Sequence, residues 1–165
     1  MDALEALKTR RSIRAYKKKK MPKNVLAGII DCARLAPTAN NRQPWEFIVV
    51  TGKETRKKIA DMTTYGKFIA NAAACVVVCG KKDADYIRED CSAATENILL
   101  AAKALGIGSC WVAGYQKAFE DELKGMLGIP GSIAVFSLVA LGYPDEQPEP
   151  HNKRSVEEVL HWEKF

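Results

Sequence analysis

The spacing of hydrophobic positions changes along the chain, and these changes predict alternating helices and strands. Between residues 86 and 105 apolar side chains recur at steps of three and four, as on one face of a long helix. Gly106 follows directly and is expected to cap that helix in the left-handed conformation. Two runs, 75–79 and 133–141, are apolar at nearly every position, which is typical of strands buried on both faces.

Shorter elements are expected between these. The same patterns predict helices over 2–8, 22–36, 53–64 and 117–126, and strands over 47–51 and 109–112. Residues 142–152 carry three prolines and are expected to form an extended arm. A last short helix should begin at Ser155, because Glu158 completes a capping box. The chain is therefore predicted to form a single α+β (mixed α/β) domain over residues 1–165, with four or five strands.

Alanines on the inward face of the 86–105 helix would let another helix approach closely. That partner could belong to the same subunit or to a second copy across a dimer seam. The sequence leaves both arrangements open.

The composition is that of a folded protein, and the cytoplasm is its expected location. The chain has 165 residues, of which 47% are hydrophobic and 27% charged, which excludes a wholly disordered chain. No apolar run approaches the roughly 20 residues that cross a bilayer, and no secretory signal precedes the first helix. The five cysteines lack CxxC spacing and are expected to be reduced, buried thiols. Neither histidine lies near them in sequence, so no metal site is predicted.

Positive charge is concentrated at the start of the chain. Of the 25 basic residues, nine fall within residues 1–24, against two acidic ones. A basic segment can bind nucleic acid, but Tyr16 is its only aromatic residue and no nucleic-acid-binding motif follows, so no such partner is predicted. Residues 17–20 are interpreted as a solvated loop. Residues 10–14 place three guanidinium groups and a hydroxyl within five positions, which suits one compact dianion such as phosphate.

The chain has no glycine-rich loop that could hold a phosphate with backbone groups. The sequence at 106–108 lacks the third glycine of a dinucleotide-binding fingerprint and precedes a strand rather than a helix. A bound nucleotide must therefore be held by side chains, and the arginines at 10–14 are the obvious candidates.

Five segments, in order and at compatible spacing, resemble motifs of the nitroreductase family, enzymes that bind flavin mononucleotide (FMN) between two identical subunits. They are RRSIR at 10–14, PTANNRQPW at 37–45, GIGSCW at 106–111, ALGYP at 140–144, and KR followed by VEEV at 153–159. The resemblance implies a three-layer sandwich in which helices flank a central, mainly antiparallel sheet. It also implies a C-terminal arm that is exchanged in a homodimer.

The resemblance further implies which residues bind FMN. Arg10 would neutralise the phosphate together with Lys153 and Arg154 from the far end of the chain. Ser12 would bond to the ribityl chain or the ring edge. Arg14 would face the pyrimidine side of the ring, where a fixed positive charge raises the reduction potential.

Other candidates carry over from the family in the same way. Arg11 would be a backbone and phosphate-side contact, and Ala113 and Gly114 would place backbone groups near the flavin N5. Three residues would reach the same flavin from the partner subunit: Pro37, Thr38 and Asn41. On sequence alone Pro37 could also be only a helix stop, and Asn41 only a turn residue.

No side chain resembles a nucleophile or a general base, so no catalytic residue is assigned and the cofactor is expected to carry the chemistry. The implied function is an FMN-dependent oxidoreductase that passes a hydride from NAD(P)H, by a ping-pong mechanism, to an acceptor such as a nitroaromatic or quinone. The alternative is a flavin carrier, redox sensor or flavin-consuming protein without NAD(P)H turnover. The reductant stays open between NADH, NADPH and a reduced protein.

One departure concerns the cover of the active site. Larger family members have an additional helical segment in mid-chain, whereas here only about twenty residues separate positions 64 and 85. The pocket is therefore expected to be more open, with Tyr65, Lys67 and Phe68 as possible rim residues.

Overall fold

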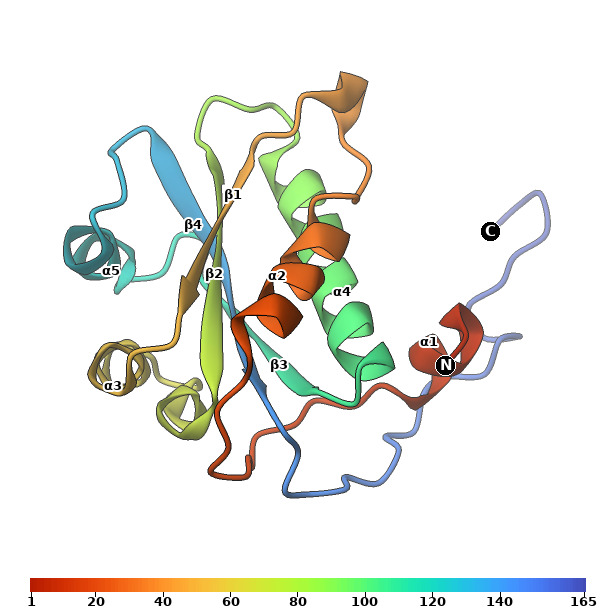
Figure 1. Ribbon diagram of the computed structural model, residues 1–165. Coiled ribbons are helices and arrows are strands. Elements are labelled where there is room, and N and C mark those ends of the chain that lie inside the picture. Colours follow the sequence, from red (N-terminus) through yellow and green to blue (C-terminus); the bar gives the residue numbers. More distant parts are fainter.

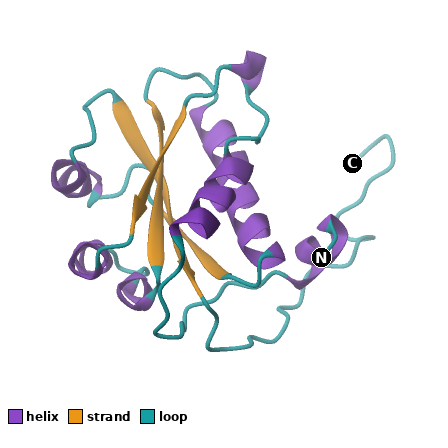
Figure 2. Ribbon diagram, viewed as in Figure 1, coloured by secondary structure: helices purple, strands orange, loops and turns teal.

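The computed structural model describes all 165 residues, and its centre is one antiparallel sheet between two layers of helices (Figure 1, Figure 2). The sheet has four strands in the order β1-β2-β4-β3. Their bounds are Trp45–Val50 (β1), Ala74–Lys81 (β2), Gly108–Ala113 (β3) and Ile133–Gly142 (β4). The predicted α+β sandwich is confirmed, and all strand pairs are antiparallel.

Helices cover both faces of the sheet. One layer consists of α2 (Lys23–Ala33) and α4 (Ile87–Ala104). The opposite layer consists of α3 (Lys53–Met62), the short 3-10 helix η2 (Lys67–Asn71) and α5 (Glu120–Leu127). The first helix, α1 (Ala3–Thr9), packs against α4, and a second 3-10 helix, η1 (Ala39–Asn41), precedes β1. No helix combines the length and the apolar character that crossing a bilayer requires.

The core lies on both sides of the two central strands. Along β2, Val76 and Val78 pack toward α2 and α4, while Cys75 and Val77 pack toward α3 and η2. Because successive side chains of a strand point to opposite faces, a strand covered on both sides must be apolar at every position. This explains the continuous hydrophobic runs of β2 and β4.

Several predicted elements differ from the structure. The strand predicted over 47–51 is β1, and it is only partly buried because it forms an edge of the sheet and Val49 faces solvent. The helix predicted over 22–36 ends earlier, at Ala33. Pro37 disfavours a helical conformation at Ala36, the residue before it, so the helix has to end before that position. Gly106 has φ 71°, as predicted for the cap of α4. Cys32 is exposed, whereas the other four thiols are buried as expected.

The predicted C-terminal helix is wrong. The capping box forms, since the Ser155 amide donates to Glu158 Oε2 at 2.7 Å and the Glu158 amide donates to Ser155 Oγ at 3.4 Å. The chain nevertheless completes only a single turn, with the Leu160 amide donating to the Val156 carbonyl at 2.9 Å. Short helices need a packed apolar face, and in one chain every residue from 151 to 165 is exposed.

The segment after α1 runs along the sheet, at the start of β3 and the end of β4. The Ile13 amide donates to the Ser109 carbonyl at 2.9 Å, and the Lys17 amide donates to the Tyr143 carbonyl at 2.9 Å. Single β-bridges join Ser12 to Ser109 and Tyr16 to Pro144. These contacts fix the arginine-rich segment to the sheet.

Two glycines make this close approach possible. A Cβ at Gly108 would lie 2.8 Å from Ile13 Cγ2, and a Cβ at Gly142 would lie 2.6 Å from Tyr16 Cδ1. Real carbon atoms do not pack so closely, so any larger residue at either position would push the segment away from the sheet. Glycine is therefore required at positions 108 and 142 for steric reasons.

Replacing Gly142 by alanine should destabilise the protein by about 1–3 kcal/mol, because the added methyl overlaps the buried Tyr16 ring. Gly125→Ala is the matched control, since a Cβ at Gly125 would meet nothing within 4 Å. Gly125 lies inside α5, so its replacement should stabilise the protein by about 0.5–1 kcal/mol. Urea unfolding followed by circular dichroism measures both effects, and equal stability of Gly142→Ala and the wild type would contradict the steric argument.

Candidate functional site

The segment from Ser12 to Tyr16 buries two side chains and presents the others outward. Ile13 and Tyr16 pack into the core, Arg14 is exposed, and Ser12 is half-buried. The Tyr16 hydroxyl donates to the Ile13 carbonyl. Burial raises the pKa of Tyr16 far above its usual range, so the phenol stays protonated and acts as an anchor.

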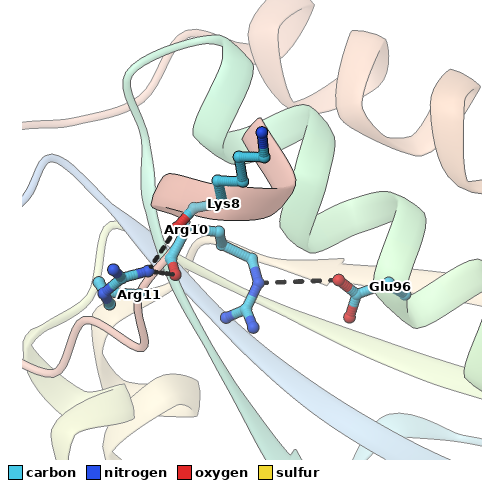
Figure 3. A network of polar contacts seen from close by, with 4 residues as sticks. All are labelled: Lys8, Arg10, Arg11 and Glu96. Atoms are coloured by element: carbon cyan, nitrogen blue, oxygen red, sulfur yellow. Dashed lines mark hydrogen bonds and ion pairs between the residues drawn. The ribbon is translucent and has the colours of Figure 1, made fainter. Parts of the chain in front are cut away.

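Arg10 and Arg11 point in different directions from the end of α1 (Figure 3). Arg10 Nε lies 3.7 Å from Glu96 Oε1 on α4, and its terminal nitrogens point away from Glu96. Arg11 Nη1 donates to the carbonyls of Lys8 at 3.0 Å and Arg10 at 2.7 Å. Arg11 therefore satisfies carbonyls at the C-terminal end of α1, and no carboxylate neutralises its charge.

The Arg14 guanidinium also lacks a carboxylate partner. Its Cζ atom lies 5.9 Å from the centroid of the Phe68 ring in η2, a cation–π contact, and it makes no ion pair. The Arg14 main-chain amide donates to Glu146 Oε1 at 2.5 Å. Two amide donors lower the pKa of Glu146, so this carboxylate is ionised at neutral pH.

A cavity of about 740 Å³ borders the same segment, which is within the usual size range of ligand pockets. Arg10, Arg11 and Glu146 are among its lining residues. Lys103, from the last turn of α4, also lines it, and its ammonium group makes no ion pair or hydrogen bond within the chain. The hydroxyl of Ser109, another lining residue, is buried without a hydrogen-bond partner.

Sequence reasoning missed Lys103, Ser109 and Glu146. Ser109 was recognised only as a member of the motif at 106–111, with no role assigned to its hydroxyl. Lys103 lies in the last turn of α4, where a lysine usually interacts with the helix dipole. Glu146 lies 132 residues from Arg14 in sequence, and no local pattern connects two such distant positions.

The structure brings some of the predicted cofactor residues together and leaves others apart. Arg10 and Arg11 line the cavity, whereas Ser12 and Arg14 of the same segment do not. Lys153 and Arg154 lie in the exposed C-terminal stretch, residues 151–165, and do not line the cavity. Pro37, Thr38 and Asn41 lie at or beside η1, at the opposite end of the subunit from α1 (Figure 1).

Ala113 and Gly114 lie where β3 ends. Ala113 pairs with Ser137 in the middle of β4 and is exposed, whereas Gly114 is buried. A Cβ at Gly114 would lie 2.9 Å from Val135 Cγ1. Packing within this subunit therefore already demands glycine at position 114.

The loop around η1 is held in an unusual conformation. Asn40, Asn41 and Gln43 have φ values of 50°, 54° and 49°, in the left-handed region that non-glycine residues rarely adopt. The Gln43 amide donates to Thr38 Oγ1 at 3.2 Å, and the Ala39 amide donates to the buried Asp90 carboxylate at 3.4 Å. Such strain persists only when surrounding contacts impose it, and it is typical of ligand-binding loops.

The buried thiols offer no nucleophile. Burial raises the pKa of Cys75, Cys79 and Cys91 to about 12, and it also raises the pKa of Cys110. A thiol must be deprotonated to attack, so these cysteines are inert near neutral pH.

The segment at 10–14 suits the phosphate of a mononucleotide. Arg10 directs its terminal nitrogens away from its carboxylate partner, and the charge of Arg11 is not neutralised. Both line a cavity of suitable size. Guanidinium groups in this state are the donors that best match a phosphate dianion.

Comparison with known proteins gives a consistent result. The sequence model described as the nitroreductase family matches residues 7–66 and 61–143. A protein of Archaeoglobus fulgidus, provisionally named NADH dehydrogenase/NAD(P)H nitroreductase, is 45% identical, and the match covers 90% of this chain and 88% of that protein.

Two solved structures match nearly the whole chain. A Bacteroides thetaiotaomicron protein of the same provisional name has a TM-score of 0.93 at 29% identity, covering 99% of this chain and 98% of the other. A Clostridium difficile protein described as an FMN-dependent nitroreductase has a TM-score of 0.90 at 32% identity, covering 98% and 99%. On the strength of the family model and a relative with nearly half its residues identical, this chain belongs to the nitroreductase family.

Proposed function

We propose that this protein is an FMN-dependent oxidoreductase that uses NAD(P)H to reduce an electron-poor acceptor such as a nitroaromatic or a quinone. Relatives named NAD(P)H nitroreductase and FMN-dependent nitroreductase support the general activity. The observation that carries the proposal is the segment at 10–14, which is fixed on the sheet and presents arginines beside a cavity.

When bound, FMN supplies the hydride chemistry, and the protein supplies position and charge. Arg10 would hold the phosphate through its two terminal nitrogens. Ser12 would bond to the ribityl chain or ring edge, and Arg14 would place its charge at the pyrimidine edge. Backbone groups at Ala113 and Gly114 would face the central ring. No step requires a protein nucleophile.

We infer that the site is completed by a second copy of the chain. Within one subunit the η1 loop and the arginine segment lie at opposite ends (Figure 1). Pro37, Thr38 and Asn41 can therefore contact the same flavin as Arg14 only from a partner subunit. The exposed C-terminal arm, with Lys153 and Arg154, would add its charges to the phosphate once it is ordered in the dimer.

Exposed apolar side chains support this assembly. They occur on α1 and on the arm, where a monomer leaves them in water. The residues are Leu4, Leu7, Val156, Val159, Leu160 and Trp162.

Anaerobic mixing of the flavin-loaded protein with NADH or NADPH should bleach the visible flavin absorption within seconds. Adding a quinone or a nitroaromatic should then restore it. Stopped-flow absorbance measures both half-reactions. If neither nucleotide bleaches the flavin, the result supports the alternative, a flavin carrier, redox sensor or flavin-consuming protein without NAD(P)H turnover.

Arg10→Ala should give folded, largely colourless protein, because a charge-assisted bond to the phosphate of roughly 1.5–3 kcal/mol is lost, which weakens FMN binding about 10- to 100-fold. Riboflavin, which has no phosphate, should bind equally well to variant and wild type. Arg34→Ala is the control, since Arg34 is exposed and pairs only with Asp31 on α2. Titration of both flavins followed by fluorescence tests the assignment, and an unchanged FMN affinity would refute it.

Arg14→Ala should retain FMN better than Arg10→Ala but lower its reduction potential. A positive charge at the pyrimidine edge favours the reduced cofactor, which carries more negative charge. Losing about 1–3 kcal/mol of that interaction corresponds to about 20–60 mV for a two-electron couple. Spectroelectrochemical titration gives the potential, and a value equal to that of the wild type would mean that Arg14 lies elsewhere.

A further inference from the structure

Glu146 holds the main chain at Arg14. Its Oε1 atom accepts from the Arg14 amide at 2.5 Å and from the Ala15 amide at 3.0 Å. In return, the Asp145 amide donates to the Ala15 carbonyl at 3.0 Å. Glu146 and Asp145, which follow β4, are thus joined to Arg14 and Ala15 by three hydrogen bonds.

These bonds replace a missing strand partner. Single β-bridges occur at Ser12 and at Tyr16. The Arg14 and Ala15 amides, which donate to Glu146, lie between these two bridges. Arg14 and Ala15 have no other acceptor for their amide hydrogens. Without the carboxylate, these two amides would bond only to water, and the main chain between the two bridges would lose this anchor.

The side chain of Arg14 is left free by the same arrangement. Glu146 bonds to main-chain amides and forms no ion pair with the guanidinium. The guanidinium rests over the Phe68 ring, which guides its direction without cancelling its charge. Arg14 is therefore held at its main chain by Glu146 and at its side chain by Phe68.

We infer that Glu146 is a positioning residue that fixes the charge of Arg14 at the pyrimidine edge of the flavin. The inference rests on the proposed function, because it assumes FMN beside Arg14. The beginning of the proline-rich arm, residues 142–152, would then help to set the reduction potential of the cofactor. This role is separate from that proposed for Lys153 and Arg154, which follow the arm.

Two simpler roles for Glu146 predict different results. If Glu146 acted only as a nearby negative charge, its removal would raise the reduction potential, since negative charge disfavours reduction. If it only fastened the fold, its removal would lower stability and leave the potential unchanged. If it positions Arg14, its removal should lower the potential, as Arg14→Ala does.

The test compares midpoint potentials of the FMN-loaded protein in Arg14→Ala and in four further variants. Glu146→Ala should lower the potential in the direction of Arg14→Ala and by no more than that variant. Glu146→Asp keeps the charge but is one methylene too short to reach both amides, so it should lower the potential by less. Adding Glu146→Ala to Arg14→Ala should lower it no further, because the positioned charge is already gone. Glu149→Ala removes an equal charge from the same segment and should not lower the potential.

The outcomes separate the inference from the function on which it depends. A potential that rises in Glu146→Ala and is unchanged in Glu146→Asp would overturn the positioning role. So would an additive further fall in the double variant. If Glu146→Ala fails to fold, Glu146→Asp decides, and an unchanged potential there overturns the inference. If the wild type takes up no FMN, or Arg14→Ala keeps the wild-type potential, it is the proposed function that fails.

Discussion

The close contact between the arginine segment and the sheet is the constraint on which the rest of the site depends. Ile13 and Tyr16 lie directly on Gly108 and Gly142, at distances that no side chain at those positions would permit. Ile13 and Tyr16 point into the core, whereas Ser12 is half-buried and Arg14 is exposed. In this short sequence the apolar members thus anchor the positions of the polar ones.

The same arrangement explains why each arginine has a different state. Arg11 is engaged by the carbonyls at the end of α1, Arg10 shares one nitrogen with Glu96, and Arg14 rests on an aromatic ring. Only one of the three is paired with a carboxylate. The segment therefore keeps most of its positive charge unpaired.

Much of the fold was predictable from sequence because the long elements have an unambiguous period. Helix α4 and the central strands β2 and β4 are packed over most of their length. Their buried positions must therefore be apolar, which gives their sequences a regular hydrophobic pattern. Edge and terminal segments lack that constraint. The strand β1 faces solvent at Val49, and the turn at Ser155 has a correct capping box but nothing to pack against. The candidate site divides in the same way: the arginines form a local motif, whereas Glu146 is brought to Arg14 only by the tertiary fold.

In a single chain the stretch from 151 to 165 is exposed throughout, including the large side chains of Trp162 and Phe165. If this segment docks on a second copy, docking and association form one equilibrium that obeys mass action. In a dimer that exchanges this segment, dilution would therefore loosen the terminus and separate the subunits together. Flavin occupancy would then depend on the abundance of the protein in the cell as well as on the supply of cofactor.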